Sequence, residues 1–251
     1  MKISVITACY NSAATLADTL DSVSAQTYAE LEHIVVDGGS RDNTLDIVKA
    51  HGKRVSNLIT GPDKGIYDAL NKGIRLATGD VIGIMHSDDI YSEPAALAKV
   101  AEFMARSGTD SCYGDLVYVE RANPEKIVRY WHSGAYAPER FKGGWMPPHP
   151  AFFLKRSVYE QHGLYNLDFP LAADYELMLR MLYRHKVSCS YLPEVLVKMR
   201  CGGTSRAGLL NTPKMLIENY RAWRHNGLPA NPLTFICKPL HKLKQFSDRP
   251  R

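Results

Sequence analysis

Carboxylates are the side chains of this sequence best suited to do chemistry. Asp88 and Asp89 are adjacent and follow an apolar run, with no Lys or Arg in the eight residues before them. Two such carboxylates can bind a hard divalent cation through oxygen, and the cation can then bridge a diphosphate and offset the charge that develops as it leaves. The other interpretation is that a polar pair simply ends a strand in a turn. The two residues alone leave both interpretations open.

Three other residues are candidates that each have an ordinary structural explanation. Asp37 precedes Gly38-Gly39, and Asp before Gly is a common turn sequence. Asp174 precedes an apolar helical pattern, where Asp often caps a helix. His149 lies between two prolines, where it can be a packed loop residue. Their joint order along the chain, rather than any one of them, indicates a site.

The elements that must position these residues alternate between strand and helix in the first half. Four apolar runs predict strands at Lys2–Thr7, Glu32–Val36, Val55–Ile59 and Val81–Met85. In the segments between them, apolar residues recur at i, i+4 and i+7, the spacing of a helix. This alternation predicts an α/β fold with an open, mostly parallel, Rossmann-like sheet and helices on both faces. Ligands bind beyond the carboxyl ends of such strands, where Thr7, Asp37 and Asp88-Asp89 fall.

The second half has a different pattern. Leu116–Glu120 and Ile127–Trp131 predict a small antiparallel pair, and helices are expected at Tyr175–Lys186 and Pro213–His225. We therefore predict one domain over residues 1–228. Residues 1–110 would be its nucleotide-sugar half and residues 111–228 its acceptor half. Residues 229–251 would form a basic, amphipathic C-terminal tail.

Composition and missing motifs exclude several classes of protein. The 251 residues are 45% hydrophobic, enough for a sizeable core. Five scattered cysteines without a CxxC pair argue against a zinc or disulfide framework and favour a reducing, cytoplasmic location. The N-terminus turns polar too soon for a signal peptide, and no run of about 18 apolar residues predicts a membrane span.

The loop after the first strand, residues 8–12, contains no glycine. The GxGxxG fingerprint and the GxxxxGK[ST] phosphate loop are both absent. These absences argue against a nicotinamide or ATP site of the usual kinds. They also argue against a nucleotidyltransferase, which needs a Gly-rich, basic loop at this position.

The tail mixes basic and apolar residues. Lys238, Lys242 and Lys244 alternate with Leu240 and Leu243, a mixture suited to an anionic membrane surface, although a solvated terminus also fits. No aromatic-interleaved basic sheet or recognition helix accompanies it, so nucleic-acid binding is not expected.

Seven segments together resemble family 2 glycosyltransferases with the GT-A fold. The nucleotide half contains VITACYNSAATLADTLDSVSAQTY, IVVDGGSRDNT, GPDKGIYDALNKGIRLATGD and IMHSDD, and the acceptor half contains HPAFFLKRSVYEQHGLYN, LAADYELMLRM and CGGTS. The resemblance covers about residues 1–225 and is strongest to bacterial enzymes that build surface polysaccharides. It implies inverting, metal-dependent transfer of a sugar from a nucleoside diphosphate, with UDP expected. The acceptor would be a saccharide or a polyprenyl-diphosphate-linked saccharide, reached from the inner face of the cytoplasmic membrane.

The resemblance also implies roles for the carboxylates. Asp89 would ligate Mg²⁺ or Mn²⁺, Asp88 would hold the ribose or a metal-bound water, and Asp174 would be the general base. Two positions depart from the family pattern, since Ser87 and Ala173 stand where acids are common. The rival to an enzyme is a catalytically silent nucleotide-sugar binding or scaffold protein with the same fold. The presence of all three carboxylates argues against it.

The remaining implied roles form two groups. On the donor side, side chains would line the base, ribose and sugar, namely Thr7, Tyr10, Asp37, Asp63, Asp68 and Asn71. On the acceptor side, the resemblance implies a role for His149, which is followed here by Pro150 where the family often has Gln. It also implies a mobile lid over the diphosphate, made by Gly202, Gly203, Thr204, Ser205 and Arg206.

Overall fold

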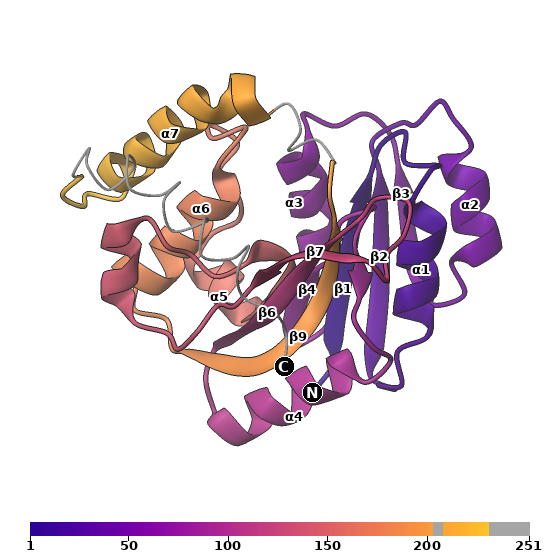
Figure 1. Ribbon diagram of the computed structural model, residues 1–251, viewed down its shortest axis with the longest axis horizontal. Coiled ribbons are helices and arrows are strands. Elements are labelled where there is room, and N and C mark those ends of the chain that lie inside the picture. The colour runs from indigo at the N-terminus through magenta and orange to yellow at the C-terminus, as the bar shows by residue number, and fades with distance from the viewer. Residues whose placement is uncertain (203–207, 231–251) are drawn as a thin grey trace.

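The computed structural model describes residues 1–202 and 208–230, without the side chains of residues 208–212 (Figure 1). The strands are β1 Ile3–Cys9, β2 Leu31–Asp37, β3 Val55–Thr60, β4 Val81–Ile84, β5 Ile90–Tyr91, β6 Ser111–Val119, β7 Ile127–Trp131, β8 Phe152–Lys155 and β9 Cys189–Arg200. The α-helices are α1 Leu16–Ser24, α2 Thr44–His51, α3 Ile66–Leu76, α4 Ala96–Ser107, α5 Arg156–His162, α6 Ala173–Met178 and α7 Gly208–His225. Short 3-10 helices lie at Pro138–Gly143 and His149–Ala151, and a π-helix follows α6 at Leu179–Arg184.

One nine-stranded sheet joins the two halves of the chain. Its main order is β3-β2-β1-β4-β8-β6-β9-β5, and β7 pairs with β6. The first four strands are parallel, as the alternation of strands and helices predicts. β8 is antiparallel to both β4 and β6, and therefore connects the nucleotide half to the acceptor half.

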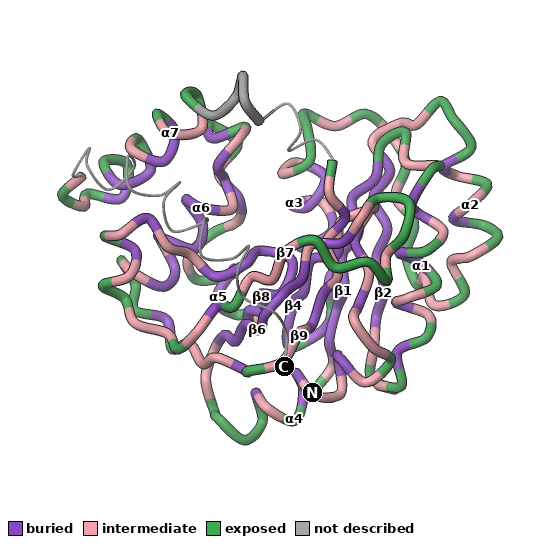
Figure 2. The backbone as a smooth tube through the Cα atoms, viewed as in Figure 1, coloured by how far each residue is buried: buried purple, intermediate pink, exposed green. Residues whose placement is uncertain are grey.

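Helices cover both faces of this sheet, and the side-chain alternation of β1 shows how. All seven residues of β1 are buried, as expected for a central parallel strand. Ile6 and Ala8 pack in the core that includes α3, α5 and α6, whereas Val5 packs with α4 and Cys9 with α1 and α2. Figure 2 shows the buried strands running between these layers. The predicted α/β architecture is confirmed.

The acceptor half is stabilised by contacts between α6 and α7. Glu176 is fully buried and forms an ion pair with Arg180 at 3.0 Å. The Asn226 amide donates to Glu176 Oε1 at 3.1 Å, and the Trp223 indole donates to the Tyr175 hydroxyl at 2.8 Å. Tyr175 and Glu176 thus hold α6, whose first turn carries Asp174, against α7 and the π-helix.

Residues 1–228 are proposed to be a single domain, because strands of both predicted halves share one sheet. The proposed boundary at residue 110 falls between α4 and β6. Within the described part of the chain, no helix combines the length and the apolar character that crossing a membrane requires. The predicted tail lies outside the described residues from 231 onward.

Replacing Glu32 with Gln should destabilise the sheet in a pH-dependent way. Although burial raises the pKa of Glu32, hydrogen bonds from Ser4, Thr78 and Lys2 lower it to about 2, from an ordinary 4.5. Because the folded-state pKa is depressed, this contribution is present above pH 4.5 and is lost as the pH falls toward 2. Thermal melts should show a loss on the order of 2–3 kcal/mol at pH 7 that shrinks below pH 4.5.

The exposed Glu30, two residues away, provides the matched control. Glu30→Gln should melt within about 1 °C of the parent protein, because isolated surface changes cost little. An equal loss for Glu32→Gln at pH 7 and at pH 3 would contradict the role of its charge.

Candidate active site

The carboxyl edge of the parallel strands brings the predicted donor-side loops together. Cys9 and Asp37 are register partners at the ends of β1 and β2, so the residues that follow them emerge side by side. Hydrogen bonds then join the loops. The Ser12 and Ser87 hydroxyls lie 2.9 Å apart, and the Thr15 hydroxyl donates to the Ser87 carbonyl at 2.9 Å. Segments separated by some 75 residues in sequence therefore form one surface.

Tyr10, Asp37 and Asp63 surround Gly38 at this edge. Tyr10 is 59% exposed and offers an open ring face. A Cβ added to Gly38 would lie 2.5 Å from Asp63 Oδ2 and 3.4 Å from the Tyr10 ring, so a side chain here would displace the Asp63 carboxylate. In such a group the aromatic ring can stack on a base, and the carboxylates can accept hydrogen bonds from the N–H groups of that base.

The carboxylate of Asp37 is held by its own loop. Its Oδ2 accepts the N–H groups of Gly39 and Ser40, both at 3.0 Å. Its Oδ1 has the Cys9 thiol at 3.9 Å as its recorded donor, which is a weak contact. The turn interpretation of Asp37 is therefore correct for one oxygen. The other oxygen keeps acceptor capacity, within a residue that is fully buried.

Thr7 and Asn71 are placed beneath the surface. The Thr7 side chain is fully buried and its hydroxyl lies 3.0 Å from His33 Nε2. The Asn71 amide donates to the Tyr165 carbonyl and accepts the Tyr165 N–H, both at 2.9 Å. Both side chains support the site from within. Their predicted contact with the donor stays a prediction, and their bonded polar groups do not favour it.

Asp68 and Asp63 stabilise the turn that leads into α3. Asp63 Oδ1 accepts the Gly65 N–H at 2.8 Å, and Asp68 Oδ2 accepts the Lys64 N–H at 3.1 Å. Lys72 lies 3.6 Å from Asp68. Both carboxylates are half-buried at the carboxyl edge, where their predicted role on the donor side remains open to test.

Asp89 is nearly inaccessible, with 1% of its surface exposed, and one of its carboxylate oxygens is unpartnered. Oδ1 accepts the Arg200 N–H at 3.3 Å, whereas Oδ2 is buried without a hydrogen bond. Burial and the neighbouring Asp88 raise the pKa of Asp89 well above its usual value, and the positive Arg200 opposes this shift. An orphaned buried carboxylate oxygen is costly unless a proton or a cation satisfies it.

Arg200 is a contributor to the site that sequence reasoning did not find. It ends β9, is 4% exposed, and donates to the Asp88 carbonyl at 3.3 Å and to the Asp18 carboxylate. Its positive charge favours the ionised form of Asp89. Nothing local in the sequence pairs Arg200 with residues more than 110 positions earlier, because β-sheet topology alone creates the contact.

The donor set at Asp88-Asp89 fits a divalent cation that takes few protein ligands. Within residues 1–202 and 208–230, no group of three or more His, Cys, Asp or Glu side chains is arranged to hold a metal ion. Mg²⁺ and similar cations often bind through one or two carboxylates plus substrate phosphates and water. Asp89 Oδ2 and the half-exposed Asp88 supply such a pair. The Arg121 guanidinium lies 4.0 Å from the Asp88 carboxylate.

Asp174 lies in the first turn of α6 and contacts the nucleotide half. The Tyr67 hydroxyl, from α3, donates to Asp174 Oδ1 at 3.1 Å, and the Tyr175 N–H donates to the same oxygen at 2.8 Å. Burial and the charge of Asp174 raise the pKa of Tyr67 well above its usual value, so this phenol keeps its proton and is the donor. The cap interpretation of Asp174 is wrong, because α6 begins at Ala173 with Ala172 as its N-cap. Asp174 instead accepts a hydrogen bond from a residue 107 positions away.

His149 belongs to a buried chain of polar side chains. His149 Nε2 lies 2.6 Å from the Tyr165 hydroxyl, and His149 Nδ1 lies 3.3 Å from His86 Nε2. Burial lowers the pKa of His149 to about 4, so its ring is neutral at pH 7. The packed interpretation of His149 is correct, although His86 links it to the turn that carries Asp88.

The predicted lid falls largely outside the described residues. Gly202 is the last residue before the gap, is exposed, and has a φ of 89°. Gly203, Thr204, Ser205 and Arg206 lie outside the description.

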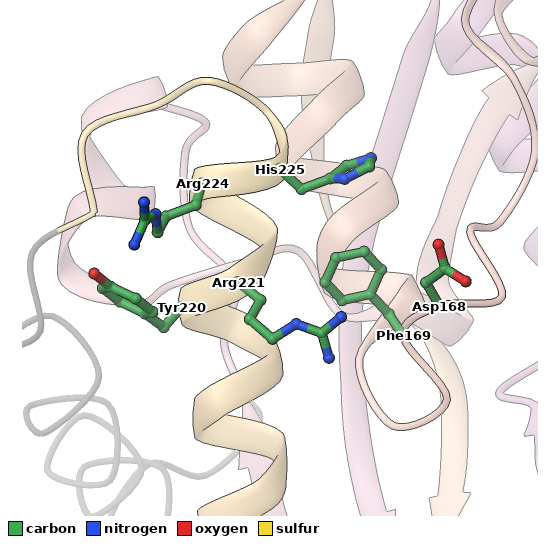
Figure 3. Close-up of a pocket in the computed structure, with 6 residues that line it drawn as sticks. All are labelled: Asp168, Phe169, Tyr220, Arg221, Arg224 and His225. Atoms are coloured by element: carbon green, nitrogen blue, oxygen red, sulfur yellow. The ribbon is translucent and has the colours of Figure 1, made fainter.

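A cavity of about 350 Å³ lies beside α7 (Figure 3). It is lined by Asp168, Phe169, Tyr220, Arg221, Arg224 and His225. Phe169 is only 2% exposed, and the Arg221 guanidinium lies 5.5 Å from its ring centre. The cavity is therefore lined by both acidic and basic side chains, and its Phe169 ring is covered. None of the predicted site residues lines it.

Comparison with known proteins supports the family resemblance seen in the sequence. The sequence model of glycosyl transferase family 2 matches residues 4–163. A PGL/p-HBAD biosynthesis glycosyltransferase of Mycobacterium bovis is 32% identical over 200 residues, covering 75% of each chain. An uncharacterized glycosyltransferase of Mycobacterium tuberculosis is 34% identical over 187 residues, covering 71% of this chain and 68% of its own length.

Two solved structures share the fold. Staphylococcus aureus TarS 1–349 in complex with UDP has a TM-score of 0.65 at 19% identity, covering 87% of this chain and 65% of that one. The mannosyltransferase PcManGT from Pyrobaculum calidifontis, in complex with GDP-Man and Mn²⁺, has a TM-score of 0.69 at 19% identity. It covers 96% of this chain and 70% of its own. At this identity the likeness is one of fold.

Proposed function

The chain belongs to glycosyl transferase family 2, and on this premise we propose that it moves a sugar, with inversion, from a nucleoside diphosphate to an acceptor hydroxyl. The observation that carries the proposal is the unpartnered Asp89 oxygen, buried at the carboxyl edge beside the polar loops. A site built to satisfy that oxygen with a cation matches a substrate that carries a diphosphate. The names of the relatives and the ligands of the two solved structures support a nucleotide-sugar donor.

On the donor side, the proposed nucleotide is UDP. The exposed Tyr10 ring would stack on the base, and Asp37 Oδ1 would accept the N3–H of uracil. Asp63 and Asp68 would border the base and sugar. Mg²⁺ or Mn²⁺, held by Asp89 with support from Asp88, would neutralise charge on the departing diphosphate when bound.

The proposed chemistry is a single displacement at the anomeric carbon. The acceptor oxygen forms a bond to that carbon as the bond to the diphosphate oxygen breaks, through an oxocarbenium-like transition state. The diphosphate leaves with the bonding electrons. Asp174 takes the proton of the acceptor hydroxyl. Attack from the face opposite the leaving group inverts the anomeric centre.

The acceptor is proposed to be a saccharide, free or linked to a polyprenyl diphosphate at the inner membrane surface. The support is the basic, amphipathic sequence after residue 228, whose lysines suit anionic headgroups. His149 and the Gly202–Arg206 segment are proposed to border the acceptor and diphosphate.

A thermal-shift screen tests the proposal. UDP-sugars with Mn²⁺ should raise the melting temperature by several degrees at about 100 times Kd, because binding stabilises only the folded state. EDTA should remove most of that gain. Release of UDP in the presence of saccharide acceptors should accompany binding.

The screen has two adverse outcomes with different meanings. No shift with any UDP-, GDP- or dTDP-sugar, and no nucleotide release, would overturn the proposed activity. A shift without any nucleotide release would instead favour a catalytically silent binding or scaffold protein.

A further inference from the structure

A hydrogen bond connects the two halves of the chain at the proposed base. Tyr67 lies in the first turn of α3, between the donor-side residues Asp63 and Asp68, and its hydroxyl donates to Asp174 of α6 at 3.1 Å. The phenol stays protonated because burial and Asp174 raise its pKa. This donor therefore persists across the pH range in which a carboxylate base works.

Tyr67 is itself held in place. Its ring stacks on Tyr165 with centroids 5.4 Å apart and an interplanar angle of 28°. Asn71, one turn along α3, bonds to both the N–H and the carbonyl of Tyr165 at 2.9 Å. The Tyr165 hydroxyl lies 2.6 Å from His149. Tyr165 is thus fixed by three hydrogen bonds, and it provides a rigid surface on which the Tyr67 ring stacks.

The hydrogen bonds to Asp174 are asymmetric. Among the described residues, the Tyr67 hydroxyl and the Tyr175 N–H both donate to Oδ1. Two donors on one oxygen fix the plane of a carboxylate and leave Oδ2 as the oxygen that can accept a further proton. A base aligned in advance loses less rotational freedom when the acceptor binds.

We propose that Tyr67 is a positioning residue that aims Asp174 Oδ2 at the acceptor hydroxyl and couples the base to the donor-binding helix α3. The inference rests on the proposed function, in which Asp174 is the base. Tyr67 needs no contact with the substrate in this role. Because α3 carries both Tyr67 and Asp68, a donor that seats correctly against α3 meets a base whose orientation that same helix sets.

Tyr67→Phe removes the hydroxyl and keeps the ring that stacks on Tyr165. Transfer kcat should fall roughly tenfold, as expected for losing one hydrogen bond to a charged group. KM for donor and acceptor should stay within about twofold. Tyr136→Phe is the matched control, because it removes a half-buried hydroxyl that donates to the Leu182 carbonyl at 3.0 Å. It should retain parental turnover.

A double-mutant cycle with Asp174→Asn separates positioning from a general structural effect. If Tyr67 acts only through the Asp174 carboxylate, adding Tyr67→Phe to Asp174→Asn should change residual turnover by less than twofold. A further tenfold loss in the double variant would overturn the inference, as would a parental kcat for Tyr67→Phe or a loss confined to KM.

The same cycle distinguishes the two levels of proposal. Parental turnover in Asp174→Asn alone would overturn the proposed base, whatever Tyr67→Phe does. A strong defect in Asp174→Asn together with a parental Tyr67→Phe would overturn only the role of Tyr67. The donor-induced thermal shift, measured on every variant, shows that each is folded and binds donor.

Discussion

Replacing Asp174 with Asn should lower the turnover of glycosyl transfer by roughly 10²–10⁴-fold, the usual contribution of a general base. Donor affinity should stay within about twofold. Asparagine has nearly the same shape, and its carbonyl oxygen can still accept the bonds from Tyr67 and the Tyr175 N–H. It cannot take the proton of the acceptor hydroxyl. Nucleotide release gives the turnover, and isothermal titration gives the donor Kd.

Asp168→Asn is the matched control for this change. Asp168 is an exposed acid six positions earlier in the loop that precedes α6, so its replacement should leave turnover within about twofold. If Asp174→Asn strongly weakened donor binding but kept normal turnover per bound donor, Asp174 would be a donor-binding residue. The proposed base would then be wrong.

Replacing Asp89 with Asn should lower transfer by at least about 100-fold and remove the gain in melting temperature that Mn²⁺ and donor give together. A neutral amide is a much weaker ligand for a hard divalent cation than a carboxylate. The protein without metal should melt at the same or a higher temperature. The reason is that burial and Asp88 raise the pKa of Asp89, so its ionised form costs folding energy.

The combination of these two results separates a binding role from a structural one. A residue that only ended a strand in a turn would lower stability with and without metal alike. Asp46→Asn, at an exposed acid on α2, should change neither quantity. Undiminished transfer by the parent enzyme in EDTA would contradict the metal role, even if Asp89→Asn were inactive.

The local elements of the fold could be predicted well from sequence patterns. The four predicted parallel strands match β1 to β4 within about two residues, since buried apolar runs between turn residues carry that information. β5, β8 and β9 were not predicted. β8 has only four residues after a proline-rich loop, and β9 contains Pro193, which weakens a strand pattern.

The candidate site divides in the same way. Asp88, Asp89 and Tyr10 were predicted from the strand ends and the family pattern, and the structure places them at one edge of the sheet. The contacts of Arg200 and Tyr67 depend on how distant elements pack, and no short-range pattern records that. Burial also changed the interpretation of Thr7, because a strand pattern does not show that its hydroxyl is already bonded to His33.

Arg200 has a consequence for the modularity of this enzyme. The family pattern matches residues 4–163 and includes Arg121, which lies 4.0 Å from the Asp88 carboxylate. The positive charge that favours the ionised form of Asp89, however, comes from Arg200, the last residue of β9. The nucleotide half therefore cannot be exchanged between proteins as an independent unit. A chimera that grafts residues 1–110 onto another acceptor half would need an arginine at the equivalent strand end. Without one, the buried Asp89 would lose the positive charge that opposes the effects of its burial and of the neighbouring Asp88.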